Sequence, residues 1–302
     1  MAEQLVKLFG KEIQKNLFPD NAFYKNSRLD GGINVNAKTV QVPQSGSIPT
    51  VVTNPTSFPL AIGSRVDDVK EYDVDLFATN PIHIQDVNMM VINYDKRSDV
   101  LSDHTLVLNT TIADKMAHVW APDGTDAAKI IKTTGQSRPS SVAGGTAKKA
   151  VNYNDVVALG AAMDSEDIPE DGRYLLVDAQ MYSDLLKINE FISFDYKAKA
   201  VSTGAVGTIL GFTVYKRSRA LFYDGSFLLK AFPNVPAATD RSGILAWHQS
   251  FVRRAEGNVK IYADTDKPDY LGSIYNAAVR GGGMIGRTDE KGVFALVQET
   301  FA

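Results

Sequence analysis

Residues 96–121, KRSDVLSDHTLVLNTTIADKMAHVWA, carry the strongest local pattern in the chain. The stretch contains neither glycine nor proline. Its stripe positions recur at steps of three or four residues: Leu101, Thr105, Leu108, Ile112, Met116 and Trp120. This spacing predicts one amphipathic helix, which Pro122 and Gly124 end. At about 1.5 Å per residue it spans nearly 40 Å, so we expect a backbone along which other elements are laid.

A polar excursion, residues 31–80, precedes this helix. Apolar and polar residues alternate over Thr39–Val42 and Val66–Phe77, around a middle rich in proline and glycine. The pattern predicts either a protruding hairpin or a β-meander in a globular domain. Because the excursion has few large apolar residues, we expect it to lie on another surface. The residues expected to contact that surface are Thr39, Val42, Val69, Tyr72 and Val74.

The first residues of the sequence predict another amphipathic helix. Apolar residues recur at steps of three and four between Glu3 and Leu17, and Asn16, Pro19 and Asp20 interrupt the pattern. The helix either packs on its own domain or forms an arm that packs on a neighbouring subunit. In the second case Leu5, Phe9 and Ile13 are candidate interface residues.

A basic segment, residues 127–154, follows the long helix. It carries five cations and no acidic residue, although the whole chain has a net charge of -3. It is interpreted either as a solvated, mobile loop or as a patch that faces DNA or an acidic partner. The cations are Lys129, Lys132, Arg138, Lys148 and Lys149.

The rest of the chain alternates helical and strand patterns. A helix over Asp155–Met163, a buried strand over Tyr174–Val177 and a helix over Ala179–Lys187 capped by Asp178 predict a small mixed α/β unit. The further strands are expected at Phe212–Tyr215, Ile244–Trp247, Val259–Ala263, Ser273–Val279 and Val293–Val297, with Gly281–Gly283 as a turn before the last one. The fold class is therefore α+β.

Composition and motifs exclude most enzyme classes. The 302 residues are 44% hydrophobic and 22% charged and include no cysteine, so a core can form without disulfides or thiolate metal sites. The run Gly281–Gly286 has the spacing G-x-G-x-x-G, but no βαβ unit can follow it so near the end of the sequence. The four histidines form no metal-binding pair. We therefore expect no catalytic, cofactor-binding or metal-binding residues. No signal peptide or membrane span is expected either.

These parts, in this order, resemble tailed-phage major capsid proteins of the Hong Kong 97 type, closest to those of short-tailed phages. The resemblance is carried by four stretches: the helix at 96–121, AKTVQVPQSGSIPT (37–50) with VDDVKEYDVDLFATNPIHIQD (66–86), GRYLLVDAQMYSDLLK (172–187) and TGAVGTILGFTVYKRSRAL (203–221). It implies an N-terminal arm (1–30), an extended β-hairpin E-loop (31–80), a P-domain with the spine helix (81–150), a mixed α/β A-domain (151–240) and a β-rich C-terminal return to both domains (241–302).

By this resemblance, the chain assembles with itself into pentamers and hexamers of an icosahedral head that encloses double-stranded DNA. The implied partners are a scaffolding protein, a portal and, through weak nonspecific contact, the packaged DNA. The implied location is the virion, with assembly in the bacterial host cytoplasm. Two alternatives remain open: an encapsulin-like compartment shell, and a β-rich hydrolase or sugar-binding protein.

Overall fold

The structure is a computed structural model of the chain. It describes residues 21–30, 38–46, 49–56, 58–60, 62–85, 96–188, 205–218, 221–233 and 235–301. The predicted N-terminal helix, with Leu5, Phe9 and Ile13, lies outside these residues.

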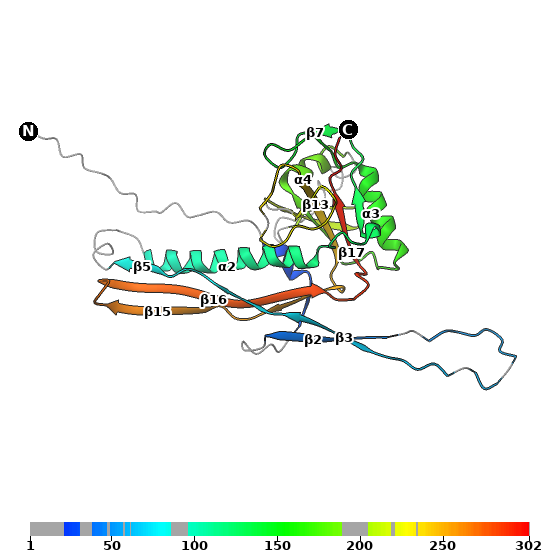
Figure 1. Ribbon diagram of the computed structural model, residues 1–302, viewed down its shortest axis with the longest axis horizontal. Helices are drawn as coiled ribbons and strands as arrows, with labels where there is room; N and C mark the ends of the chain where they lie inside the picture. Colours follow the sequence, from blue (N-terminus) through cyan, green and yellow to red (C-terminus); the bar gives the residue numbers. More distant parts are fainter. Residues whose placement is uncertain are drawn as a thin grey trace, which may run out of the picture.

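A long helix and a long strand run side by side and form the axis of the molecule (Figure 1). The helix α2 (Lys96–Trp120) confirms the amphipathic helix that was predicted within residues 96–121. It packs along β16 (Gly272–Ile285), the central strand of a six-stranded sheet. The strands β14 and β15 pair with successive parts of β16, as do β5 and β4. The remaining strands of this sheet are β1 (Arg28–Leu29), β4 (Asp75–Ala78), β5 (Ile82–Gln85), β14 (Val252–Glu256) and β15 (Lys260–Lys267).

A second, seven-stranded sheet forms the compact part of the molecule at the C-terminal end of α2 (Figure 1). Its path is β10-β11-β9-β13-β17-β6, with β12 paired to β13. The strands are β6 (Ile130–Lys132), β9 (Arg173–Asp178), β10 (Ala205–Ile209), β11 (Phe212–Arg217), β12 (Leu221–Tyr223), β13 (Arg241–His248) and β17 (Val293–Val297). Two helices, α3 (Tyr153–Ser165) and α4 (Ala179–Leu185), pack on this sheet, and Asp178 caps α4 by accepting a hydrogen bond from the backbone N–H of Gln180. The short elements are η1 (Ala22–Lys25), η2 (Ala127–Lys129), β7 (Ser137–Arg138) and β8 (Lys148–Lys149).

An aromatic core joins the two sheets to α2. Trp120, which ends the helix, lies 6.0 Å from Trp247 of β13 between ring centroids, and Phe23 of η1 meets both rings edge-on. Both indole N–H groups donate to backbone carbonyls, Trp120 to Arg253 at 3.0 Å and Trp247 to Asn26 at 2.9 Å. Each buried indole N–H therefore has a hydrogen-bond partner on another element. The ring contacts and these hydrogen bonds together hold α2 and the two sheets in one arrangement.

The glycine run is part of a strand, so the prediction of a turn at Gly281–Gly283 is wrong. All three residues lie within β16 and pair with β14. A Cβ at Gly282 would lie 2.5 Å from the backbone oxygen of Asp73, and one at Gly283 would lie 2.7 Å from Sδ of Met116. Glycine is needed here because a hairpin and the spine helix approach the strand this closely.

Candidate assembly surfaces

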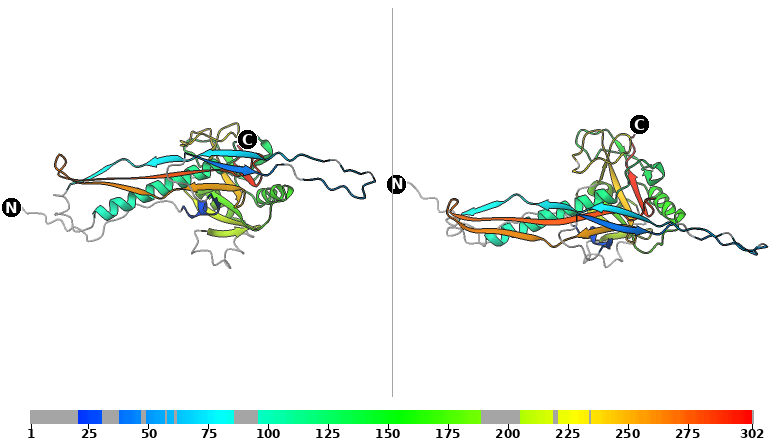
Figure 2. Two further views of the ribbon diagram at one scale, coloured as in Figure 1. Left: turned by 90° about the horizontal axis from the view of Figure 1, so that it is seen from below. Right: turned by 60° about the horizontal axis from the view of Figure 1, so that its bottom comes forward.

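A two-stranded hairpin projects beyond the body of the molecule (Figures 1 and 2). Its strands, β2 (Thr39–Gln44) and β3 (Asp68–Asp73), pair antiparallel from Thr39 opposite Asp73 to Gln44 opposite Asp68. The chain between them, residues 45–67, is called the tip loop below. The predicted protruding hairpin is therefore present, and its strands begin close to the predicted residues.

The root of the hairpin is packed inside the subunit. Val42, Tyr72 and Val74 are buried at 2%, 8% and 4% exposure, in a cluster with Ala255 and Met284 of the six-stranded sheet. The expectation that these three side chains face a neighbour is therefore wrong, because the apolar face of the hairpin covers its own sheet. Thr39 and the half-exposed Val69 remain on the outer face, and their contact with a neighbour stays a prediction.

A polar network fixes the same root. The Tyr72 hydroxyl donates to Asp30 Oδ2 at 2.8 Å, and Asp30 also pairs with Arg253 of β14 at 2.6 Å. Burial and the neighbouring Asp30 carboxylate raise the pKa of Tyr72. The phenol therefore stays protonated and remains a hydrogen-bond donor to Asp30. This bond and the ion pair of Asp30 with Arg253 hold the root of the hairpin on the body.

The tip loop exposes apolar side chains and carries almost no charge. No ionisable residue occurs between Gly46 and Ser64. The most exposed of its described apolar residues are Ile62 at 97%, Val51 at 92%, and Phe58 and Val66 at 77% each. Proline and glycine content predicted only a turn-rich middle here, and the uncharged run is a second signal that is visible in the sequence. Exposed apolar groups that gather on one loop are typical of contact sites.

Charged residues brace the base of the tip loop. The Arg65 Nε donates to Asp67 Oδ1 at 2.7 Å, and the backbone N–H of Gly46 donates to the same oxygen at 2.8 Å. These contacts, the Gly46 N–H first, lower the pKa of Asp67. The two sides of the loop are thus tied together where the regular strands end.

The basic segment is ordered, and its charges are largely paired within the chain. Lys129 pairs with Glu166, Lys132 with Glu299, and Arg138 with Asp184. Lys148 is buried at 2% exposure, and burial chiefly lowers its pKa. The interpretation of residues 127–154 as a solvated, mobile loop is wrong. The alternative, a patch that faces DNA, is weakened because most of these cations are paired within the chain.

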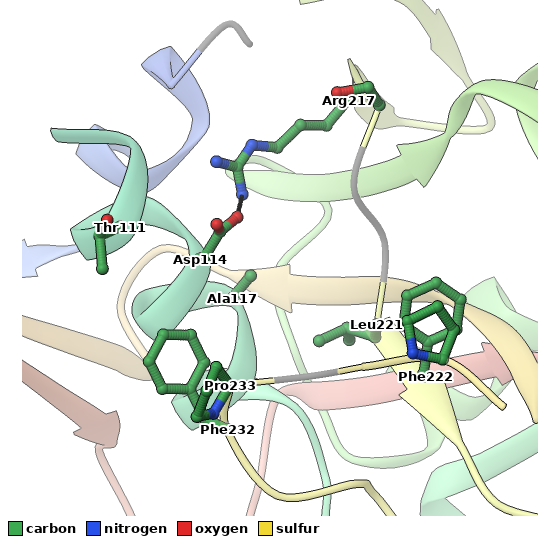
Figure 3. Close-up of a pocket in the computed structure, with 10 residues that line it drawn as sticks. Thr111, Asp114, Ala117, Arg217, Leu221, Phe222, Phe232 and Pro233 are labelled. Carbon is green, nitrogen blue, oxygen red and sulfur yellow. Dashed lines mark ion pairs between the residues drawn. The ribbon is translucent and has the colours of Figure 1, made fainter. Parts of the chain in front are cut away.

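A cavity of about 510 Å³ lies between α2 and the loops of the seven-stranded sheet (Figure 3). Thr111, Asp114 and Ala117 of α2 line one side. The other side is lined by Arg217, Ser218, Leu221, Phe222, Phe232, Pro233 and Pro236. No sequence pattern marks Arg217, although its side chain is only 1% exposed and pairs with Asp114 at 2.5 Å.

The described histidines and carboxylates make isolated contacts rather than metal-binding clusters. No three histidine, aspartate or glutamate side chains of the described residues come together to hold a metal ion. Two imidazoles contact the backbone: the half-buried His118 meets the Lys230 carbonyl at 2.7 Å, and the buried His248 meets that of Asp171 at 2.8 Å. Within the described part of the chain, no helix is long and apolar enough to cross a bilayer.

Solved structures that are similar to this one include capsids of phages and of a GTA particle. The capsid of cyanophage P-SCSP1u aligns over 97% of this chain and 92% of its own, with 19% identity and a TM-score of 0.67. The capsid of Ralstonia phage GP4 aligns over 99% and 96%, with 12% identity and a TM-score of 0.67. The capsid of a native GTA particle aligns over 98% and 96%, with 14% identity and a TM-score of 0.66. At these identities the likeness establishes the fold.

An elongated body along α2 with a projecting hairpin is the fold that this chain shares with phage capsid structures. A family model described as phage capsid protein matches residues 109–297. The chain therefore belongs to the phage capsid protein family, as a major capsid protein of the phage head and a component of the virion. The expected capsid fold and function are confirmed. No curated protein gives a significant match.

Proposed function

We propose that copies of this chain form rings of five and six that close into an icosahedral shell around double-stranded DNA, with each tip loop lying on a neighbour. The observation that carries this proposal is the exposure of Val51, Phe58 and Ile62 on a loop that cannot reach its own core. A loop on one copy and its receiving surface elsewhere on the next form a heterologous contact. Contacts of this type generate rings when the rotation closes.

The domain ranges, the interface residues and the further partners belong to the same proposal. The E-loop, P-domain and A-domain take the residue ranges expected above, and Thr39 and Val69 lie on the face of the hairpin that meets the neighbour. A scaffolding protein and a portal take part in assembly in the bacterial cytoplasm. The packaged DNA touches the inner surface weakly and without sequence preference, since the chain has a net charge of -3.

Electron microscopy of the purified protein, with a scaffold present, tests the proposal. The parent chain should form shells, or rings of five or six subunits. The double variant Phe58→Ser/Ile62→Ser should fold but form few particles, because it removes apolar area that only assembly buries. The matched control, Thr50→Ser/Thr53→Ser, changes the same loop without removing large apolar groups and should assemble normally. A monodisperse monomer under every condition would contradict the proposal.

Nuclease treatment of particles from infected cells tests the enclosed DNA. A shell around a genome should leave long double-stranded DNA protected from digestion. Particles that protect a protein cargo and no nucleic acid would instead support the compartment alternative.

A further inference from the structure

The described chain begins at the rim of the cavity. The Asn21 side chain donates to Thr110 Oγ1 at 3.2 Å and accepts from Arg217 Nη2 at 3.0 Å. Arg217 lines the cavity, and so does Thr111, the residue after Thr110. Whatever precedes Asn21 therefore leaves from this rim. Figure 3 shows η1 approaching the same group of side chains.

The cavity suits a neutral, apolar occupant. Its two charged groups, Asp114 and Arg217, already pair with each other at 2.5 Å. The rest of its lining is mostly apolar, including Ala117, Leu221 and Phe232. Its volume of about 510 Å³ falls in the range of pockets that enclose a drug-sized ligand, so large side chains fit inside.

The sequence directly before Asn21 supplies such groups. Leu17, Phe18 and Pro19 form an uncharged apolar run that ends two residues before Asn21. Three extended residues span about 10 Å, so Phe18 can reach the cavity while Asn21 stays in place. Attachment to the same chain also gives this run a high effective concentration at the cavity, which a neighbour's segment lacks.

We propose that the cavity binds Leu17 and Phe18 of the same chain. The root of the N-terminal arm is then fixed on its own subunit, and only the residues before it are left to contact a neighbour. This docking is intramolecular, so it holds for an unassembled subunit as well as for one in a shell.

Disulfide formation tests the docking, because the chain has no cysteine of its own. In Phe18→Cys/Ser218→Cys, the second cysteine replaces an exposed residue of the cavity lining. Mild oxidation should link most chains internally, giving faster migration on a non-reducing gel at the mass of a single chain. The control Lys7→Cys/Ser218→Cys should stay mostly unlinked. A link between two chains would assign the cavity to a neighbour's arm, and no link at all would leave it without this occupant; either result overturns the proposal.

Hydrogen exchange gives a second readout without cysteines. Phe18→Ala should speed exchange in residues 111–117 severalfold, whereas Lys7→Ala should leave it unchanged. Equal exchange in both variants would overturn the docking. Micrographs of the same preparations keep the two proposals separate, since shells without the internal link would reject the docking and retain the assembly.

Discussion

Arg217 is one side chain that joins three parts of the subunit. It extends from β11, pairs with Asp114 of α2 and donates to Asn21 beside η1. Its guanidinium also lies 5.4 Å from the centroid of the Phe23 ring. A planar, permanently charged fork suits such a position, because it can donate in several fixed directions at once.

Replacing Arg217 should therefore destabilise the subunit strongly. We expect Arg217→Met to lower the free energy of unfolding by about 3–5 kcal/mol, as is usual when one partner of a buried ion pair is removed. Urea unfolding of the unassembled subunit measures this. The control is Arg65→Ala, which breaks a pair whose side chains are 54% and 57% exposed and should cost far less, because solvent screens exposed pairs. Equal costs would mean that Arg217 is not a structural junction.

His118 should make the subunit sensitive to mild acid. Burial lowers the pKa of its imidazole, and Nε2 is occupied as a donor to the Lys230 carbonyl. The unfolded chain therefore binds a proton at higher pH than the folded chain does. The stabilisation from neutral His118 is fully present above the unfolded value of about 6.5 and is lost as pH falls from there towards the folded pKa.

Thermal melting at pH 7.5 and pH 5 measures this dependence. His118→Gln keeps a donor for the carbonyl but cannot titrate, so its melting temperature should fall less between the two pH values than that of the parent. His83→Gln changes an exposed imidazole and should behave as the parent does. An identical pH response in the His118 variant would contradict the assignment.

Among the elements, β16 depends on glycine for a reason that can be tested. Gly282→Ala should cost about 1–3 kcal/mol, because its Cβ would lie 2.5 Å from the Asp73 backbone oxygen and neighbouring backbone must move. Gly281→Ala is the matched control in the same strand, since its Cβ would meet Ile112 at an ordinary 3.5 Å. Chemical denaturation of both variants should separate them. If both were tolerated, the packing of the hairpin on this strand would be loose.

Local sequence patterns predicted the bounds of helices and strands well. They did not predict which residues far apart in the sequence contact one another. The bounds of α2 and of β17 follow from periodicity and breakers that act within a few residues. A glycine run signals chain reversal just as well as close approach, and only the position of Asp73, more than 200 residues away, decides between them.

The candidate assembly surfaces show the same contrast between local patterns and long-range contacts. Alternation correctly indicated one buried face for the hairpin, but alternation cannot reveal whether the covering surface belongs to the same chain, as it does for Val42 and Tyr72. The pairing of Arg138 with Asp184 likewise joins residues far apart in sequence. The cations of the basic segment, residues 127–154, seemed to have no partners in the sequence because the acidic residues that pair with them lie outside it. The apolar tip could have been recognised from its uncharged composition alone.

At the scale of the whole molecule, folding and assembly use different surfaces. The aromatic core and the root of the hairpin are complete within one subunit. We propose that the tip loop and the free part of the arm find apolar partners only when other copies are present. Because binding stabilises the folded state by mass action, an assembled chain should melt at a higher temperature than an unassembled one.

Removing residues 1–13 should reduce only that difference. The deletion removes Leu5, Phe9 and Ile13, the predicted contacts with a neighbour, and keeps Leu17 and Phe18 for the cavity. We therefore expect the unassembled subunit to melt as the parent does, while assembled shells melt at a lower temperature or form in lower yield. Calorimetry of both states, with particle yield from electron microscopy, measures the two effects separately. If the shells were unchanged and the free subunit melted earlier, the arm would be a helix packed on its own domain, the alternative that its apolar stripe also allows.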